Sequence, residues 1–136
     1  MQLTLFHASP VNIKKFYIPY GGLHFGGINS ALEAALRKVR ISKSKIVYLH
    51  ECTVNVNSFF ECEDLCTHDD WERHIEYMKI HEKDNVLKYK NKFEPDVVPS
   101  YVVWDENLVK IVNVKVLTQD EAEDIVMENM YARCKK

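Results

Sequence analysis

The chain has 136 residues, a formal net charge of −2 and a hydrophobic fraction of 46%. These values predict one folded domain over residues 1–136 and give no overall electrostatic reason for binding nucleic acid or a membrane. No apolar run reaches the ~20 residues that a membrane helix needs, and the first residues lack the pattern of a signal peptide, so we expect a cytoplasmic protein. Basic residues gather at positions 37–45 and 88–92, which we interpret as solvated faces rather than as a phosphate-binding surface.

The N-terminal part of the chain pairs a short strand with a glycine-rich loop. Residues 2–7 alternate and are rich in β-forming side chains, which predicts a strand that ends at His7. Residues 11–20 favour at most one turn of helix. All four glycines then fall within residues 21–27, with His24 among them. Because glycine tolerates approaches that a side chain forbids, we expect a ligand or another backbone segment to come close to this loop.

The remaining elements are predicted from periodicity and capping residues. Asn29 is a suitable N-cap for a helix that runs to about residue 40. Thr67 and Thr118 are each followed by acidic residues, which predicts the start of two further helices. Strands are expected over residues 45–56, 85–89, 100–104 and 108–116, with an acidic loop after the first of them. This order of elements is α+β, with strands crowded into the second half.

Three of these elements are predicted to bury one face. The second helix should turn inward Trp71, Ile75 and Met78. The final helix should turn inward Ala122, Ile125, Val126 and Met130. In the late strands, Tyr89, Tyr101 and Val103 should point into the core, with their neighbours outward.

The sequence predicts no metal site. The four cysteines form no Cys-x-x-Cys pair. Cys62, Cys66 and His68 imitate a zinc cluster, but their spacing is irregular and a fourth ligand is not evident. The His-Glu pairs at positions 50–51 and 81–82 form no ordered triad, and no nucleophile elbow or phosphate loop is present, so a hydrolase has little support.

Three short motifs carry a resemblance to a known family. They are Phe6-His7-Ala8-Ser9, Gly22-Leu23-His24-Phe25 and Ser100-Tyr101-Val102-Val103-Trp104-Asp105. In this order they resemble the His-Tyr-Glu signature of the ADP-ribosyltransferase fold, in its poly-ADP-ribose polymerase and diphtheria-toxin-like branch. Residues 89–94, followed by residues 100–103, are also similar to small transferase-like proteins of phages and phage-linked toxins. The resemblance covers most of residues 3–115 and implies two small, packed, mainly antiparallel sheets with flanking helices.

The resemblance implies that the chain binds NAD and needs no metal. The family's histidine, matched by His7, hydrogen-bonds the adenosine-side ribose, and the main chain at Ala8 would hold the nicotinamide amide. His24 stands where the signature tyrosine packs on the nicotinamide ring, and an imidazole can also stack there. Ser30 matches a serine that hydrogen-bonds the carboxamide. The other expected NAD-binding residues are Ser9, Gly22, Phe25 and Tyr101.

The sequence departs from the family at the glutamate that stabilises the oxocarbenium-like transition state, where Ser100 stands. A hydroxyl can bind ribose but carries no charge, so its presence should weaken turnover more than binding. Glu94, on the preceding loop, could supply the carboxylate. Asp105 is less well placed, since five residues along a strand span roughly 16 Å. The expected catalytic residues are therefore His7, His24, Glu94 and Ser100.

Two functions remain open from the sequence. The first is an NAD-dependent ADP-ribosyltransferase that releases nicotinamide and modifies a macromolecule, with protein favoured over nucleic acid. The second is a non-catalytic protein of the same fold that binds NAD, ADP-ribose or a protein partner, such as a phage-encoded inhibitor acting in the host cytoplasm. A Glu94 carboxylate aimed at the cleft between His7 and His24 would favour the first, and the serine at position 100 favours the second. The sequence predicts neither the acceptor atom nor the oligomeric state.

Overall fold

The structure of the protein is a computed structural model that describes residues 1–17, 22–56, 60–65, 67–81, 86–91, 96 and 98–134. The described elements follow one another as β1 (Gln2–Ser9), β2 (Leu23–Phe25), α1 (Ile28–Val39), β3 (Ile46–Asn55), β4 (Phe60–Glu63), α2 (His68–His81), β5 (Val86–Lys90), β6 (Ser100–Val103), β7 (Val109–Thr118) and α3 (Gln119–Cys134). A short 3-10 turn, η1 (Glu106–Leu108), precedes β7.

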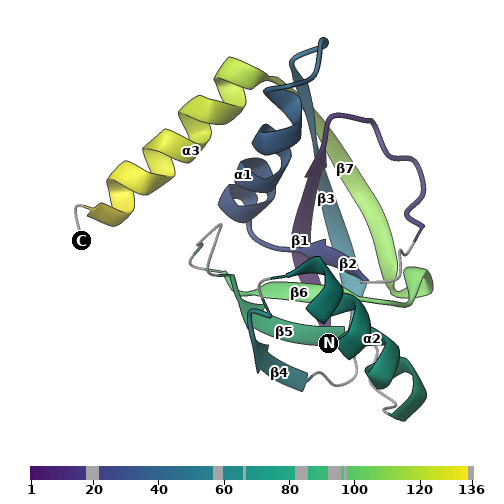
Figure 1. Ribbon diagram of the computed structural model, residues 1–136. Coiled ribbons are helices and arrows are strands. Elements are labelled where there is room, and N and C mark those ends of the chain that lie inside the picture. The colour runs from purple at the N-terminus through teal and green to yellow at the C-terminus, as the bar shows by residue number, and fades with distance from the viewer. Residues whose placement is uncertain are drawn as a thin grey trace.

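The described strands form two sheets (Figure 1). The first sheet has the order β1-β3-β7 and is antiparallel. The second sheet has the order β2-β6-β5-β4, in which β4 and β5 run parallel and the other neighbours run antiparallel. The predicted α+β class, with mainly antiparallel sheets and flanking helices, is therefore confirmed at this level.

In the part of the chain that the structure describes, three clusters of buried side chains hold these layers together. The first lies between the first sheet and the helices α1 and α3, and it includes Leu36 and Val47. The second lies between the two sheets and includes Leu5 and Tyr101. The third lies between the second sheet and α2 and is built around Trp71. The second sheet is consequently covered on both faces, by the first sheet on one side and by α2 on the other.

The long strands of the first sheet change their buried face partway along. In β1, Leu5 belongs to the core between the sheets, whereas Ala8 packs under α1. In β3, Leu49 likewise packs in the core under α1, and Cys52 packs in the core between the sheets. Side chains two residues apart lie on the same face of a strand. Leu5 and Ala8, like Leu49 and Cys52, are three residues apart, so the two members of each pair lie on opposite faces. The first sheet therefore faces α1 at one end and the second sheet at the other.

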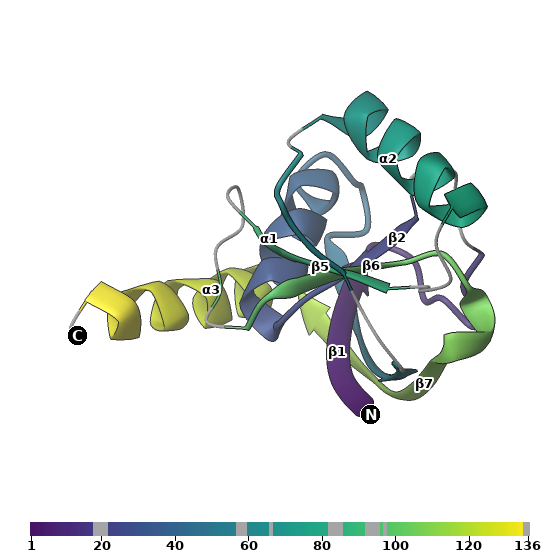
Figure 2. The ribbon, with the colours of Figure 1, turned by 90° about the horizontal axis from the view of Figure 1, so that it is seen from below.

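Within the described ranges, a pair of backbone hydrogen bonds joins the two sheets at Phe6 and Gly26. The Phe6 N–H donates to the Gly26 carbonyl at 2.8 Å, and the Gly26 N–H donates to the Phe6 carbonyl at 3.0 Å. Gly26 directly follows β2, and Figure 2 shows β2 beside β1 in this region. The glycine loop therefore fixes how the edge of the first sheet meets the edge of the second.

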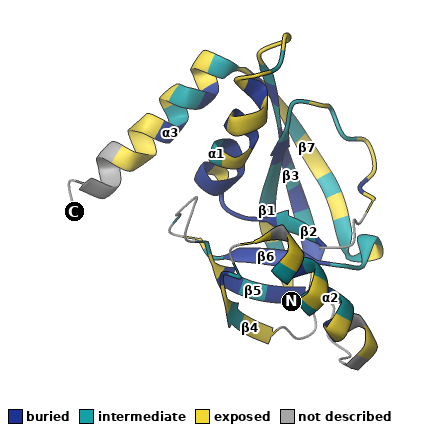
Figure 3. Cartoon of the chain, viewed as in Figure 1, coloured by how far each residue is buried: buried dark blue, intermediate teal, exposed yellow. Residues whose placement is uncertain are grey.

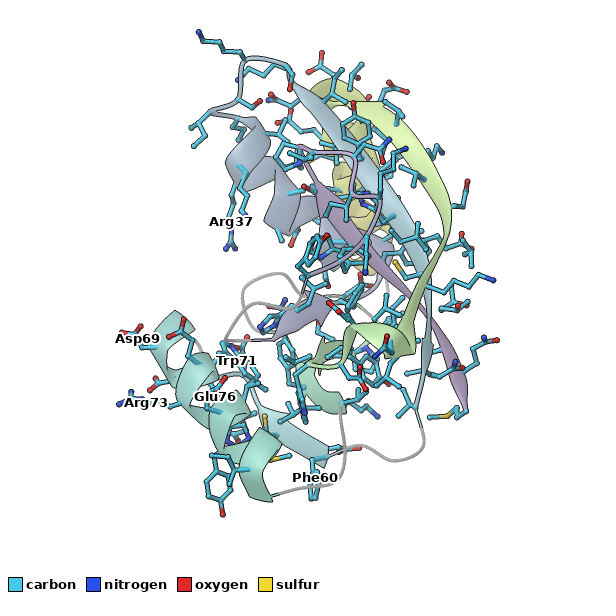
Figure 4. The ribbon with its side chains drawn as sticks, turned by 90° about the vertical axis from the view of Figure 1, so that its right-hand side faces the viewer. Arg37, Phe60, Asp69, Trp71, Arg73 and Glu76 are labelled. Atoms are coloured by element: carbon cyan, nitrogen blue, oxygen red, sulfur yellow. The ribbon has the colours of Figure 1, made fainter. Side chains whose placement is uncertain are left out.

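Helix α2 buries the face that its periodicity predicted. Trp71, Ile75 and Met78 are all buried. Figure 4 shows Trp71 pointing from α2 toward the body of the protein, whereas Asp69 and Arg73 point away from it. The predicted inward face of this helix is confirmed.

The start of α3 is capped as predicted, but the start of α1 is not. Thr118 and Glu121 form a capping box, in which the backbone N–H of each donates to the side chain of the other at 3.1 Å. The predicted N-cap of α1, Asn29, is wrong, because the N-cap is Gly27. Asn29 lies inside the helix, where its Oδ1 accepts a hydrogen bond from Asn129 Nδ2 of α3 at 3.5 Å.

The inward face of α3 is confirmed only over its first turns. Ala122 and Val126 are buried, and Ile125 packs partly buried against the same core. Met130 is 43% exposed, so its predicted burial is wrong. Figure 3 shows the exposed share of α3 growing along its length, as the helix runs past the end of α1.

The second sheet contains two strands that the sequence did not predict and a central strand that is more buried than predicted. The sequence predicts a glycine turn at residues 22–26 and a loop after β3, yet these stretches contain β2 and β4. Tyr101 and Val103 are buried as predicted, but Ser100 and Val102 are buried too. The prediction that the neighbours point outward is wrong because β6 is covered on both faces (Figure 3).

Candidate functional site

A pocket of about 110 Å³ lies where the two sheets meet α1. Its walls come from β1, β2 and the start of α1, together with residues from β5 and β6. The polar residues that line it are His7, His24, Ser30, Tyr89, Asn91 and Ser100, and the apolar ones are Phe6, Ala8, Phe25, Gly26, Ala31 and Ala34. No lysine, arginine, aspartate or glutamate is among the described residues of this lining.

The two histidines predicted to carry the chemistry lie side by side. His7 Nδ1 is 3.0 Å from the carbonyl oxygen of His24. Because a carbonyl only accepts, Nδ1 carries the proton, and Nε2 is an acceptor when the ring is neutral. Burial lowers the pKa of His7 below its usual 6.5, against the opposing effect of the bond to the His24 carbonyl. At neutral pH His7 is therefore an uncharged ring with one acceptor nitrogen.

A third histidine, which the sequence did not single out, supports this end of β1. His50 is fully buried, its Nδ1 donates to the carbonyl of His7 at 3.0 Å, and its Nε2 accepts the backbone N–H of Ile13 at 2.9 Å. An imidazole that donates from one nitrogen and accepts at the other is neutral, and burial lowers the pKa of His50 accordingly. Phe16 meets both His7 and His50 edge-on, with ring centroids 5.3 and 5.9 Å away.

His24 is positioned by two aromatic side chains that come from distant parts of the chain. Its Nδ1 lies 2.8 Å from the hydroxyl of Tyr89 in β5. Its ring meets Trp71 of α2 edge-on, with centroids 5.0 Å apart. Tyr89 and Trp71 also contact each other, with centroids 4.8 Å apart. These contacts hold the plane of the His24 ring in one orientation at the pocket wall.

The main chain of Ala8 lies at an open edge of β1. Phe6 gives both of its backbone groups to Gly26 rather than to β3. In an antiparallel pair the residues that bond across alternate along the strand, so Ala8, two residues on, directs its N–H and C=O to the same edge as Phe6. Among the described residues, no backbone group outside β3 is hydrogen-bonded to the N–H or the C=O of Ala8. Since Ala8 lines the pocket, its N–H and C=O are a main-chain donor and a main-chain acceptor at the pocket edge.

Two buried serines flank the glycine that joins the sheets. A side chain on Gly26 would bring its Cβ within 3.1 Å of both the Ser100 hydroxyl oxygen and the Cβ of Ser30. Both serines are buried. Among the described residues, the close approach predicted for this loop is made at Gly26 by another backbone segment, that of Phe6, and the two serine side chains leave no room for a Cβ there.

The structure brings some of the predicted site residues to this pocket and leaves others elsewhere. His7, Ala8, His24, Phe25, Ser30 and Ser100 line it. Ser9 instead accepts a hydrogen bond from the backbone N–H two residues on, at 3.1 Å. Gly22 has a φ of +75° directly before β2, and Tyr101 packs into the core between the sheets. Glu94 lies outside the described residues.

Three polar residues at or near the pocket were not predicted as site residues. The sequence predicts a core position for Tyr89 and a loop that contains Asn91 and Asp96. The carboxylate of Asp96 accepts the backbone N–H of Ser30 at 3.0 Å and so caps α1. No local sequence signal points to Asp96, because Asn29 offers a nearer N-cap candidate and only the structure shows that α1 has no capping side chain of its own.

No protein-family model matches the chain, and no curated protein sequence matches it. Among the described helices, none combines the length and the apolar character needed to cross a membrane. Within the described part of the chain, no three His, Cys, Asp or Glu side chains gather as metal ligands would, and Cys66 lies outside that part.

Proposed function

We propose that the chain has the ADP-ribosyltransferase fold and that its pocket binds the nicotinamide end of NAD. One observation carries the proposal. The residues that the resemblance matched to NAD contacts, His7, Ala8, His24 and Ser30, come from β1, β2 and α1 and line a single pocket. A pocket of about 110 Å³ is smaller than the roughly 300–1,000 Å³ of sites that hold drug-sized ligands. It suits one ring of NAD, with the rest of the dinucleotide outside.

The polar groups at the pocket floor match those of a carboxamide. The N–H of Ala8 can donate to the amide oxygen, and the C=O of Ala8 can accept from the amide nitrogen. Ser30 Oγ can accept the second amide proton. A planar group that carries an acceptor and two donors is thereby satisfied at every polar atom, as burial of a polar group requires.

The two histidines serve different parts of the bound molecule. His24, its ring held by Tyr89 and Trp71, packs against the pyridine ring of nicotinamide. His7, neutral at neutral pH, accepts a hydrogen bond from a ribose hydroxyl through Nε2. The tautomer of His7 follows from its bond to the His24 carbonyl, so one contact orders both residues.

In the proposed reaction the bond between the nicotinamide nitrogen and ribose C1′ breaks, and the bonding electrons leave with nicotinamide. A nucleophile on the acceptor then forms a bond to C1′ and loses its proton. The ribose gains positive charge on the way, and Ser100 can offer it only a hydroxyl. Glu94 is the proposed carboxylate, a protein side chain is the proposed acceptor, and the cytoplasm is the proposed setting.

The uncharged Ser100 supports a second candidate function. Without a carboxylate at the ribose, the same pocket would bind NAD or ADP-ribose without turning it over. The protein would then act through binding, for example as an inhibitor in the cytoplasm of a phage host. The two candidates share the pocket and differ only in turnover.

Incubation with NAD labelled in the nicotinamide ring, alone and in cell lysate, separates the candidates. For a transferase, the wild type releases nicotinamide, and Glu94→Gln lowers the rate at least about tenfold with little change in NAD affinity. Glu128→Gln on an exposed turn of α3 is the matched control and should leave the rate unchanged. NAD binding without release supports the binder. Absence of NAD binding refutes the nicotinamide pocket.

A further inference from the structure

A second pocket, of about 430 Å³, lies in a part of the protein that the proposed NAD contacts do not use. Its walls come from the segment that follows β1 and from η1 with the first residues of β7, which Figure 1 shows close to each other. It shares no lining residue with the first pocket, which His7 and His24 line. Its volume lies within the roughly 300–1,000 Å³ of sites that hold small organic ligands.

Three lysines from two distant parts of the chain line this second pocket, which we call the lysine pocket. Lys14 and Lys15 belong to the segment after β1, and Lys110 is the second residue of β7. All three are exposed, and among the described residues no carboxylate lies within ion-pair distance of any of them. Lys15 Nζ lies 5.9 Å from the centroid of the Tyr17 ring, a contact that leaves its charge in place. Neighbouring positive charges repel one another, and an anion bound between them would relieve that repulsion.

The two basic clusters that stand out in the sequence are arranged differently. Arg40 pairs with Glu123 at 3.3 Å, and Lys88 pairs with Glu61 at 3.5 Å, so part of their positive charge is balanced. The lysine pocket has three amines and one carboxylate, that of Glu106, in its lining. It therefore carries an excess of two positive charges in a chain whose formal net charge is −2. A concave surface with such an excess attracts an anionic ligand.

The floor of the lysine pocket is apolar and belongs to the core between the sheets. Phe16 is 6% exposed, and Val109 and Ile111 pack partly buried against the same core. The Phe16 ring also meets His7 and Phe25 edge-on, with centroids 5.3 and 5.4 Å away. A ligand that joins an anionic group to an apolar body suits this pocket better than a bare ion. The body covers the apolar floor while the amines hold the charge.

We propose that the lysine pocket is a binding site for a small organic phosphate, separate from the nicotinamide pocket. The phosphate lies between the amines of Lys14, Lys15 and Lys110, and the organic part lies against Phe16. A phosphate suits the site better than a carboxylate, because it carries up to two negative charges and offers one terminal oxygen to each amine. Lysine binds phosphate as a point charge and needs no planar, paired geometry. The inference does not rest on the proposed function, since the two pockets share no lining residue.

The test titrates the whole protein with phenyl phosphate at pH 7.5 and follows the backbone NMR signals. The amides of residues 14–16 and 106–111 should shift and saturate. Phenyl phosphate should bind at least about fivefold more tightly than inorganic phosphate, which lacks the apolar part, and than benzyl alcohol, which lacks the charge. Added salt should weaken the binding of phenyl phosphate, because its charge is held at an exposed site.

Three variants test the charges one at a time. Lys110→Gln removes one of the amines and should lower the affinity for phenyl phosphate at least about fivefold. Lys115→Gln is the matched control, because Lys115 is also exposed on β7 but does not line the pocket, and the affinity should stay within about twofold. Glu106→Gln removes the carboxylate and should raise the affinity about two- to threefold. A folding defect could only lower the affinity, so an increase separates charge from structural damage.

Each outcome decides for or against the site. Saturable shifts around Phe16 that weaken in Lys110→Gln and strengthen in Glu106→Gln support it. Equal losses in Lys110→Gln and Lys115→Gln overturn it, because they reflect the overall charge alone. Absence of saturable binding, or shifts confined to the first pocket, overturns it as well. Equal affinities for phenyl phosphate and inorganic phosphate overturn the role of the apolar floor. All of these results stand whether or not the chain binds nicotinamide.

Discussion

The two sheets of this protein are built in different ways. The strands of the first sheet, β1, β3 and β7, have 8, 10 and 10 residues and pair along most of their length. Those of the second sheet, β2, β6, β5 and β4, have 3 to 5 residues and come from segments separated by helices and loops. The first sheet keeps much of β7 exposed, whereas β6 at the centre of the second is buried throughout. A long strand shows the alternation of buried and exposed residues in its own sequence, whereas the burial of a short strand depends on the elements that cover it.

The pocket lies where these two kinds of sheet meet. His7 comes from the end of a long strand and His24 from the shortest one, and the bond from the His7 ring to the His24 carbonyl crosses between them. Neither sheet forms the pocket alone. The position of the site therefore depends on the core between the sheets as well as on the residues that line it.

The largest expected effect comes from opening that shared core. Leu5 is 1% exposed and packs between the sheets. Leu5→Ala should lower the free energy of unfolding by about 2–5 kcal/mol, because it leaves a cavity that close packing cannot fill. Hydrogen exchange should show lost protection in both sheets. Leu36→Ala, in the core under α1, is the control, and its loss should centre on α1 and the first sheet. Unchanged protection of β5 and β6 in Leu5→Ala would show that the two sheets are stable independently.

A smaller effect is expected at the start of the shortest strand. Gly22 has a φ of +75°, and a Cβ there would lie 2.5 Å from Val102 Cγ1 of β6. Gly22→Ala should cost roughly 2–3 kcal/mol from backbone strain and crowding together. Chemical denaturation measures the loss. Val102→Ala removes the crowded atom but leaves a cavity of its own, so Gly22→Ala should cost less in a Val102→Ala background than in the wild type. An equal cost in both backgrounds would show that crowding is not the cause.

The cap of α3 tests whether an element distant from the pocket can be weakened separately. Thr118→Ala removes the side chain that accepts the Glu121 N–H and should cost about 1 kcal/mol. Thermal unfolding gives the size of the loss, and ligand affinity should not change. Thr67→Ala removes the corresponding cap of α2, whose Trp71 contacts His24, and should affect stability and the pocket together. An effect of Thr118→Ala on ligand affinity would contradict this separation.

The smallest expected effect comes from lowering the pH. Burial depresses the pKa of both His7 and His50 in the folded state, so the unfolded chain binds their protons more readily. Their contribution is present above about pH 6.5 and should decline as the pH falls through that value toward the lower folded pKa. Denaturation midpoints between pH 7.5 and 5 measure the decline. His50→Gln should flatten it. A pH profile identical to that of the wild type would exclude His50 as a source.

Burial favours the uncharged form of Cys52, as it does for His7 and His50. Cys52 is buried in the core between the sheets, and burial raises the pKa of its thiol to about 12. The thiol therefore stays protonated and unreactive at neutral pH. Its alkylation should require unfolding, which makes Cys52 a probe of the same core that Leu5 tests.

Much of the first sheet could be predicted from sequence, because its strands and helices carry local signals. The β-forming run at residues 2–7, the alternation through residues 45–56 and the capping box of Thr118 and Glu121 each point to one structure, and each is found. The same local signals failed at β2 and β4. A strand of three or four residues has too few side chains for periodicity to distinguish it from a turn.

Sequence alone determined the types of the long elements, the inward face of α2 and the candidate pocket residues His7, Ala8, His24 and Ser30. Tertiary structure decided that Asp96 rather than Asn29 caps α1, that Tyr89 and Trp71 hold His24, and that β6 is covered on both faces. The reason is physical. Periodicity and capping depend on neighbours within a few residues, whereas these contacts join groups brought together only by packing. Asp96 and Ser30, 66 residues apart along the chain, meet only because β6 packs beside β2 at the start of α1.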